Sequence, residues 1–135
     1  MRVLNKSRKA RKTTIIKTAS EALAAFNIVG VTTSGQIKKS TSATELLATA
    51  YGMVEKAIGS GSAGEVTIDG EIYNPAWAWT IDGTNNNLLW IDASTSFLTE
   101  TIPATAGRFS APIAQITSAT TIVLRINPFN VTEVL

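Results

Sequence analysis

The chain has 135 residues, a length too short for two full domains. Its hydrophobic residues, 44% of the total, are enough for one modest core. It contains neither cysteine nor histidine, so disulfide bonds, thiolate metal sites and the commonest general base are excluded. Its formal net charge is +2, and no apolar run approaches the roughly 20 residues that a membrane-spanning helix needs. We therefore expect one domain with no cofactor, no membrane partner and no enzymatic activity.

The charge is distributed unevenly along the chain. The first twelve residues carry six basic side chains, namely Arg2, Lys6, Arg8, Lys9, Arg11 and Lys12. The remaining residues carry six basic and ten acidic side chains. Because like charges repel and this first segment has little apolar content, we predict that residues 1–12 form an extended basic arm. Residues 13–135 then form a single, mildly acidic domain.

Beyond the arm, short β-branched runs alternate with turn residues, which is typical of an all-β domain. In chain order, the predicted strands cover residues 26–32, 36–39, 65–73, 88–92, 111–117 and 122–126. In the third of these, Val66, Ile68 and Ile72 alternate with polar residues, so one face of the strand is expected inside. The last two form a hairpin that turns at Ser118 and Ala119. The expected architecture is a small β-barrel or β-sandwich.

The segment between Leu47 and Ile58 supports two interpretations. Its apolar residues recur at the spacing of an amphipathic helix, and periodicity alone favours that structure. Gly52 and the glycine-rich turn before Glu65 instead favour a strand that enters a hairpin. Both alternatives stay open on the residues alone.

Five segments follow one another in a familiar order: Val31–Lys38, Ala50–Ala57, Gly64–Ile72, Leu89–Ser94 and Pro112–Ile122, the last followed by Asn127 and Pro128. This order resembles the small β-barrel modules of tailed-phage virion proteins, especially capsid decoration or cement proteins. It is also similar to the distal parts of some fibre and head-fibre proteins. The resemblance covers residues 26–128, and the arm lies outside it. It implies a strand rather than a helix at 51–58, which is the alternative we adopt.

The resemblance implies a structural function on the outer surface of a tailed-phage head. The protein would bind the major capsid protein, stabilise contacts between capsomers and form a homo-oligomer, for which a trimer is the expectation where three capsomers meet. The alternative that it implies is a head-fibre or tail-fibre module that binds a host surface.

The basic arm has three interpretations: a segment that binds the capsid surface, a nucleic-acid-binding segment and a solvated tail. Lysine and arginine release counterions from phosphate, so such an arm can bind nucleic acid without reading sequence. It carries no aromatic side chain for base stacking, which single-strand binders generally use. We therefore predict a capsid-contacting arm at Arg2, Lys6, Arg8, Lys9, Arg11 and Lys12, and no nucleic-acid partner.

Three tryptophans, Trp77, Trp79 and Trp90, form the other candidate surface. Exposed indoles stack on sugar rings, but large aromatics in a small domain more often belong to a core or a subunit interface. If 76–79 is extended, Trp77 and Trp79 share one face. We predict an oligomer or ligand surface at these residues.

Two sets of oxygen-bearing side chains are weaker candidates. The loop Asp82–Asn87 loosely resembles a calcium loop, but it lacks the bidentate glutamate and the regular acidic spacing, and its residues are ordinary turn formers. Glu65, Asp69 and Glu71 fall on one strand face, where a pair could serve glycoside hydrolysis. A solvated row of carboxylates is the commoner arrangement, so we predict neither metal ligands nor catalytic residues.

Overall fold

The structure, a computed structural model, describes residues 12–40, 50–83, 86–92, 94–102, 109–110, 112–126 and 132–133. Within these residues every regular element is a strand, which confirms the predicted all-β class, and no helix has the length and apolar character to cross a membrane. The described strands are β1 (Lys12–Thr18), β2 (Ile28–Val31), β3 (Ile37–Lys39), β4 (Gly52–Met53), β5 (Ala63–Tyr73), β6 (Leu88–Ile91), β7 (Leu98–Thr99), β8 (Phe109–Ser110), β9 (Ala114–Ser118), β10 (Thr121–Arg125) and β11 (Thr132–Glu133).

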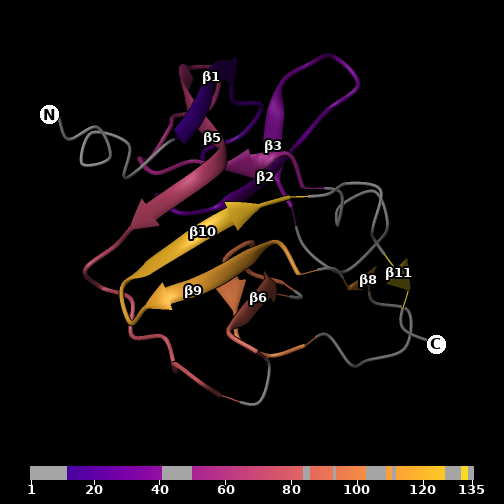
Figure 1. Ribbon diagram of the computed structural model, residues 1–135. Helices are drawn as coiled ribbons and strands as arrows, with labels where there is room; N and C mark the ends of the chain where they lie inside the picture. Colours follow the sequence, from indigo (N-terminus) through magenta and orange to yellow (C-terminus); the bar gives the residue numbers. More distant parts are fainter. Residues whose placement is uncertain are drawn as a thin grey trace, which may run out of the picture.

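The long strand β5 organises the main sheet (Figure 1). The strand order is β3-β2-β4-β5-β10-β9-β6-β7, and β1 also pairs with β5; β8 and β11 form a separate pair. Thr67 has Cα partners in both β1 and β4, whereas Gly70 has partners in both β1 and β10. Because a strand has only two edges, β4 and β10 occupy successive stretches of one edge of β5, and β1 occupies the other. The antiparallel sheet therefore curls into a half-barrel.

The residues that follow β1 contact β3, the strand at one end of the sheet order. Ala19 forms a parallel bridge with Ile37 of β3, and the Ser20 N–H donates to the Ile37 carbonyl at 2.8 Å. The Glu21 carboxylate accepts the Lys39 N–H at 2.9 Å, which extends this contact by one more residue. Strands β1, β5, β4, β2 and β3 are thus joined in a ring.

Two hydrophobic clusters fill the fold. The small cluster lies within the ring and consists of Ala19, Leu23, Val29, Ile37, Val54, Ile58 and Val66. The large cluster lies beneath the rest of the sheet and consists of Ile28, Ala50, Met53, Ile72, Leu89, Ile91, Ile113, Ala114, Ile116, Ile122 and Leu124. Ile28 and Val29 are neighbours in β2 but belong to different clusters, as do Met53 and Val54. Strand β2 and the end of β4 therefore have a core on each face, which explains their adjacent apolar residues.

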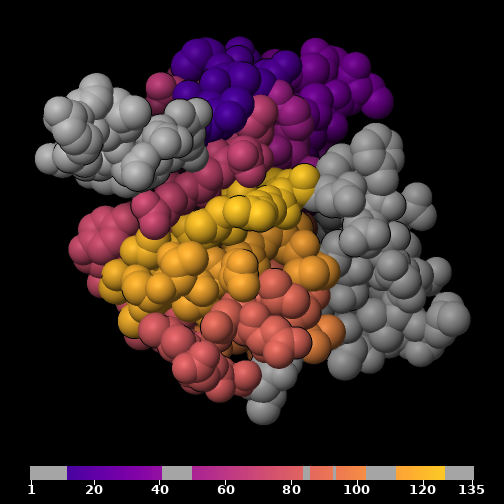
Figure 2. Space-filling model, viewed as in Figure 1, coloured from indigo at the N-terminus to yellow at the C-terminus, as the bar shows by residue number. Residues whose placement is uncertain are grey.

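Figure 2 shows the same division from outside. The indigo and purple N-terminal residues lie on one side of the magenta band that contains β5, and the yellow strand β10 lies on the other.

Most of the predicted strands are confirmed, with small differences at their ends. The predictions at 26–32, 36–39, 65–73, 88–92 and 122–126 correspond to β2, β3, β5, β6 and β10, and the predicted terminal hairpin is β9–β10. Its turn lies at 119–120, one residue later than predicted, and Ala111 lies outside the described residues. Short differences at strand ends are expected because terminal residues pair least regularly.

Two segments differ from their predictions. The strand adopted for 51–58 is present only at Gly52–Met53, with Ile58 in an isolated bridge to Leu23; no helix occurs at 50–58, and 41–49 lies outside the described residues. Gly52 explains the close pairing, because a Cβ there would lie 2.6 Å from the Thr67 carbonyl oxygen. The second difference is β1, which alternation does not predict and which includes Lys12.

Candidate functional site

Lys12, predicted as the last residue of the basic arm, is the first residue of β1. Its Nζ lies 3.0 Å and 3.1 Å from the two carboxylate oxygens of Glu55. The Thr67 hydroxyl, buried beneath this pair, donates to Glu55 Oε2 at 2.6 Å. The ion pair and the hydrogen bond together hold the start of β1 against β5 and the segment that follows β4. Lys12 therefore belongs to the body, whereas Arg2, Lys6, Arg8, Lys9 and Arg11 lie outside the described residues.

The remaining side chains of β1 divide between its two faces. Ile15 packs against the small cluster, whereas Ile16 is 61% exposed and is the most exposed of the large hydrophobic residues described. Lys17 shares the face of Ile15 by alternation and is half-buried. Its partner on β5 is Gly64, which offers no side chain, and no ion pair joins Lys17 to another described residue. Strand β1 thus presents one exposed apolar side chain and one positive charge that is not paired within the described part of the chain.

The three tryptophans are not one exposed surface. Trp77 and Trp79 are half-buried against the large cluster; their ring centroids lie 5.4 Å apart, and Trp77 also lies 5.2 Å from Phe26. Trp90 is only 6% exposed, so the surface predicted at this residue is corrected: it is a core residue. Residues 76–79 do alternate in exposure, as predicted, although they form no strand. The Trp79 Nε1–H is buried and has no hydrogen-bond partner among the described residues.

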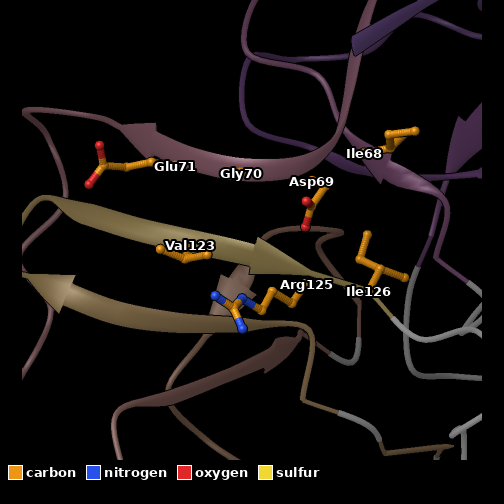
Figure 3. Close-up of a pocket in the computed structure, with 7 residues that line it drawn as sticks. All are labelled: Ile68, Asp69, Gly70, Glu71, Val123, Arg125 and Ile126. Atoms are coloured by element: carbon orange, nitrogen blue, oxygen red, sulfur yellow. The ribbon is translucent and has the colours of Figure 1, made fainter. Parts of the chain in front are cut away.

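Two carboxylates of β5, Asp69 and Glu71, border an open groove of about 790 Å³ that is lined by residues of the paired strands β5 and β10 and by Ile126 (Figure 3). Asp69 and Glu71 project from β5, and Arg125 lies opposite Asp69 in the strand register. In Figure 3 the Arg125 guanidinium points away from the Asp69 carboxylate. Glu65 is exposed and borders a different groove, beside Lys12 and Glu55. The three carboxylates therefore share a strand but do not converge on one point.

The loop Asp82–Asn87 has the geometry of a turn in its described part. Asp82, Asn86 and Asn87 all have positive φ, and the Asn87 side-chain oxygen accepts the Asp82 N–H at 2.7 Å. Asparagine and aspartate adopt this left-handed conformation more readily than other non-glycine residues. Residues 84–85 lie outside the described part of the chain. Across the ranges that are described, no three His, Cys, Asp or Glu side chains come together closely enough to hold a metal ion.

One carboxyl group has a shifted pKa. Asp92 follows β6, and its Oδ1 accepts the N–H groups of Ser94 at 2.9 Å and Thr95 at 3.2 Å. These hydrogen bonds, that of Ser94 first, favour the charged form and lower the pKa of Asp92, and partial burial opposes them. The carboxylate closes the turn that leads to Ser96, which is buried with a φ of 65°. Asp92 is therefore a structural group of the loop.

Comparison with protein-family models and with curated proteins finds no match for the chain.

The residues that pin β1 to the body were not predicted from the sequence. Glu55 lies 43 residues from Lys12, in the segment whose structure the sequence leaves ambiguous. Thr67 alternates as a solvent-facing residue of its strand but is 2% exposed, because Glu55 covers it. One feature of the sequence does single out β1, and it is Ile16. This isoleucine follows another isoleucine, at a position where alternation in a strand would require a polar residue.

Proposed function

We propose that the protein is a structural capsid decoration protein that binds the outer surface of a tailed-phage head and stabilises the contacts between capsomers. The observation that carries this proposal is the junction between the basic segment and the body. The segment that precedes β1 carries Arg2, Lys6, Arg8, Lys9 and Arg11. It joins a strand whose seven residues all have Cα partners in β5.

This junction supports the proposal because the basic segment is attached directly to the main sheet, so a partner that binds the segment also holds the sheet. Lys12 pairs with Gly70 of β5 and is held by Glu55 at 3.0 Å, and Glu55 in turn accepts the Thr67 hydroxyl of β5, so the first described residue is already fixed to the sheet. A charged segment that binds an acidic shell surface would then position the whole body on the shell. The order of the five sequence segments that resemble decoration proteins gives independent support.

The mechanism we propose is stabilisation by mass action. A protein that binds only the assembled shell lowers the free energy of that state and shifts the equilibrium away from expansion or bursting. Several copies that also contact one another gain avidity, since the second contact is made at a high effective concentration. No chemical step is required of any side chain.

The test is a truncation that spares β1. The variant lacking residues 2–11 is mixed with purified phage heads that lack the native decoration protein, and binding is measured by co-sedimentation. We expect at least a tenfold loss of binding with an unchanged far-ultraviolet circular dichroism spectrum. Binding as strong as that of the full chain would remove the basic segment from the mechanism.

Three further measurements would redirect the proposal. Electron microscopy of labelled protein on heads should place it on the outer surface, and an internal position would contradict decoration. Binding to a glycan array that Trp77→Ala abolishes would instead support a host-surface module. Binding to DNA with a steep salt dependence, without binding to heads, would support a nucleic-acid partner.

A further inference from the structure

We propose that the free edge of β1 accepts an extended acidic segment of the shell protein as an additional strand. This deepens the proposed function and rests on it for the source of the segment. On one side β1 pairs with β5 along its whole length, from Lys12 opposite Gly70 to Thr18 opposite Ala63. On the other side the described part of the chain supplies no strand partner until the bridge at Ala19.

An edge of this kind offers the backbone hydrogen bonds on which strand addition depends. Seven residues in extended conformation span roughly 23 Å, at about 3.3 Å per residue. Main-chain hydrogen bonds then supply affinity, and alternate side chains supply specificity. The edge is therefore long enough to bind a peptide segment of similar length.

The side chains of β1 define what such a segment must carry. Ile16, 61% exposed, gives the outer face an apolar contact. Lys17 gives the other face a positive charge that faces Gly64 and has no ion pair with a described residue. Directly opposite residues on neighbouring strands have Cβ atoms about 5 Å apart, so a carboxylate on the incoming strand would neutralise Lys17. The incoming segment is predicted to alternate acidic and apolar residues.

The charge pattern argues against a second copy of this chain on the same edge. Residues 1–20 contain seven basic side chains and no acidic one, so a second β1 would bring the same charge to the contact. Lysines on edge strands, especially those on the inward face, are a common device against pairing between copies. The positive charge also makes the edge selective for acidic strands.

The experiment uses synthetic peptides and the full-length protein, so it requires no phage head. The acidic strand peptide is TEVEVET, acetylated and amidated, with a fluorescent label, and binding is measured by anisotropy at 0.15 M salt. Two peptides serve as controls: TEPEPET, which keeps the charge but cannot form a regular strand, and TKVKVKT, which reverses the charge. We expect saturable binding of TEVEVET that is at least tenfold tighter than that of either control.

Two variants locate the binding site. Lys17→Glu should weaken TEVEVET at least tenfold, whereas Lys38→Glu, a half-buried strand lysine in β3, should change it less than twofold. Ile16→Thr should weaken it several-fold and serves as the second test if Lys17→Glu does not fold. Amide hydrogen exchange should slow in β1 when the peptide binds.

Three results would overturn the proposal. Equal binding of TEPEPET would mean that charge alone attracts the peptide, and unchanged affinity in Lys17→Glu and Ile16→Thr would place the site elsewhere. Self-association that Ile16→Thr removes would assign the edge to a second copy. A full-length protein that binds TEVEVET but does not bind purified heads would contradict the proposed function and leave the strand site standing, so the two failures are distinguishable.

Discussion

The two hydrophobic clusters share β5 but are assembled from different kinds of contact. The small cluster is enclosed by short strands and by loop residues such as Leu23 and Ile58, which meet through an isolated bridge. The large cluster lies beneath the β9–β10 hairpin, whose strands pair directly after a two-residue turn. The first region therefore depends on contacts between distant parts of the chain, and the second depends largely on local pairing.

This difference matters for function because the candidate surface belongs to the first region. The β1 edge and the Lys12–Glu55 pair lie on the ring, whereas the aromatic residues Phe26, Trp77 and Trp79 pack on the large cluster. If the regions unfold together, partner binding at β1 stabilises the whole molecule. If they unfold separately, it stabilises only the ring.

The largest expected effects come from one core truncation in each cluster. Ile37→Ala and Leu124→Ala remove fully buried side chains, and each should lower the free energy of unfolding by about 3 kcal/mol. Because β5 contributes to both clusters, we expect one cooperative transition in both variants. Urea unfolding followed by circular dichroism and by tryptophan fluorescence measures this, since Trp77 and Trp79 report on the large cluster.

Non-coincident transitions in Ile37→Ala would contradict this expectation. A ring that unfolds first would lower the circular dichroism signal while the tryptophan signal stays native. The two regions would then be separate units of different stability.

The next largest effect is expected at the closest approach of β4 to β5. Gly52→Ala places a Cβ 2.6 Å from both the Thr67 carbonyl oxygen and Val66 Cγ1, so β4 must move and stability should fall by about 2 kcal/mol. Gly59→Ala is the matched control, because its Cβ would meet only Ser62 Oγ at 3.6 Å. Denaturant midpoints that fall equally in both variants would show that the close contact at Gly52 does not decide the effect.

The local pairing of the second region explains why the sequence predicts it well. In β10, Ile122 and Leu124 alternate with more exposed residues, and the partner strand follows within one turn. In β1, two threonines precede two isoleucines, so no alternation marks a half-buried strand. Its partner β5 lies far along the chain, and pairing at that range leaves no signal in a local window.

The same reasoning separates the predicted from the unpredicted parts of the candidate site. Charge count alone identifies the basic segment, because it needs no three-dimensional contact. The contact of Lys12 with Glu55 depends on β1, β4 and β5 meeting, which neither residue encodes by itself. Trp90 was misplaced for a related reason, since a tryptophan gives the same signal whether its strand face is covered or open.

A smaller effect is expected where polar groups pin β1 to the ring. Thr67→Val removes the donor of the 2.6 Å hydrogen bond to Glu55, and Glu55→Gln removes the charge that holds Lys12. A double-mutant cycle between these positions should give a coupling of about 1 kcal/mol. The exposed Thr14→Val, next to Thr67 in the strand register, is the control and should change stability by less than about 0.5 kcal/mol. A coupling near zero would mean that the contact between Glu55 and Thr67 does not stabilise the ring.

The smallest effect is expected in the second region, at Asp92. Asp92→Asn keeps an oxygen acceptor for the Ser94 and Thr95 N–H groups but loses the charge, so stability near neutral pH should fall by about 1 kcal/mol or less. Because the pKa of Asp92 in the folded protein lies below its ordinary value of 3.8, the native carboxylate contributes its full stabilisation above that value. The contribution is lost as the pH falls through the lower pKa of the folded state. Urea midpoints of wild type and Asp92→Asn, measured between pH 7 and pH 2.5, should therefore converge as the pH falls.

A gap between the urea midpoints of wild type and Asp92→Asn that stays constant down to pH 2.5 would contradict this assignment. The Asp92 carboxylate would then contribute no pH-dependent stability to the turn, and its hydrogen bonds to the Ser94 and Thr95 N–H groups would not favour the charged form over the neutral amide.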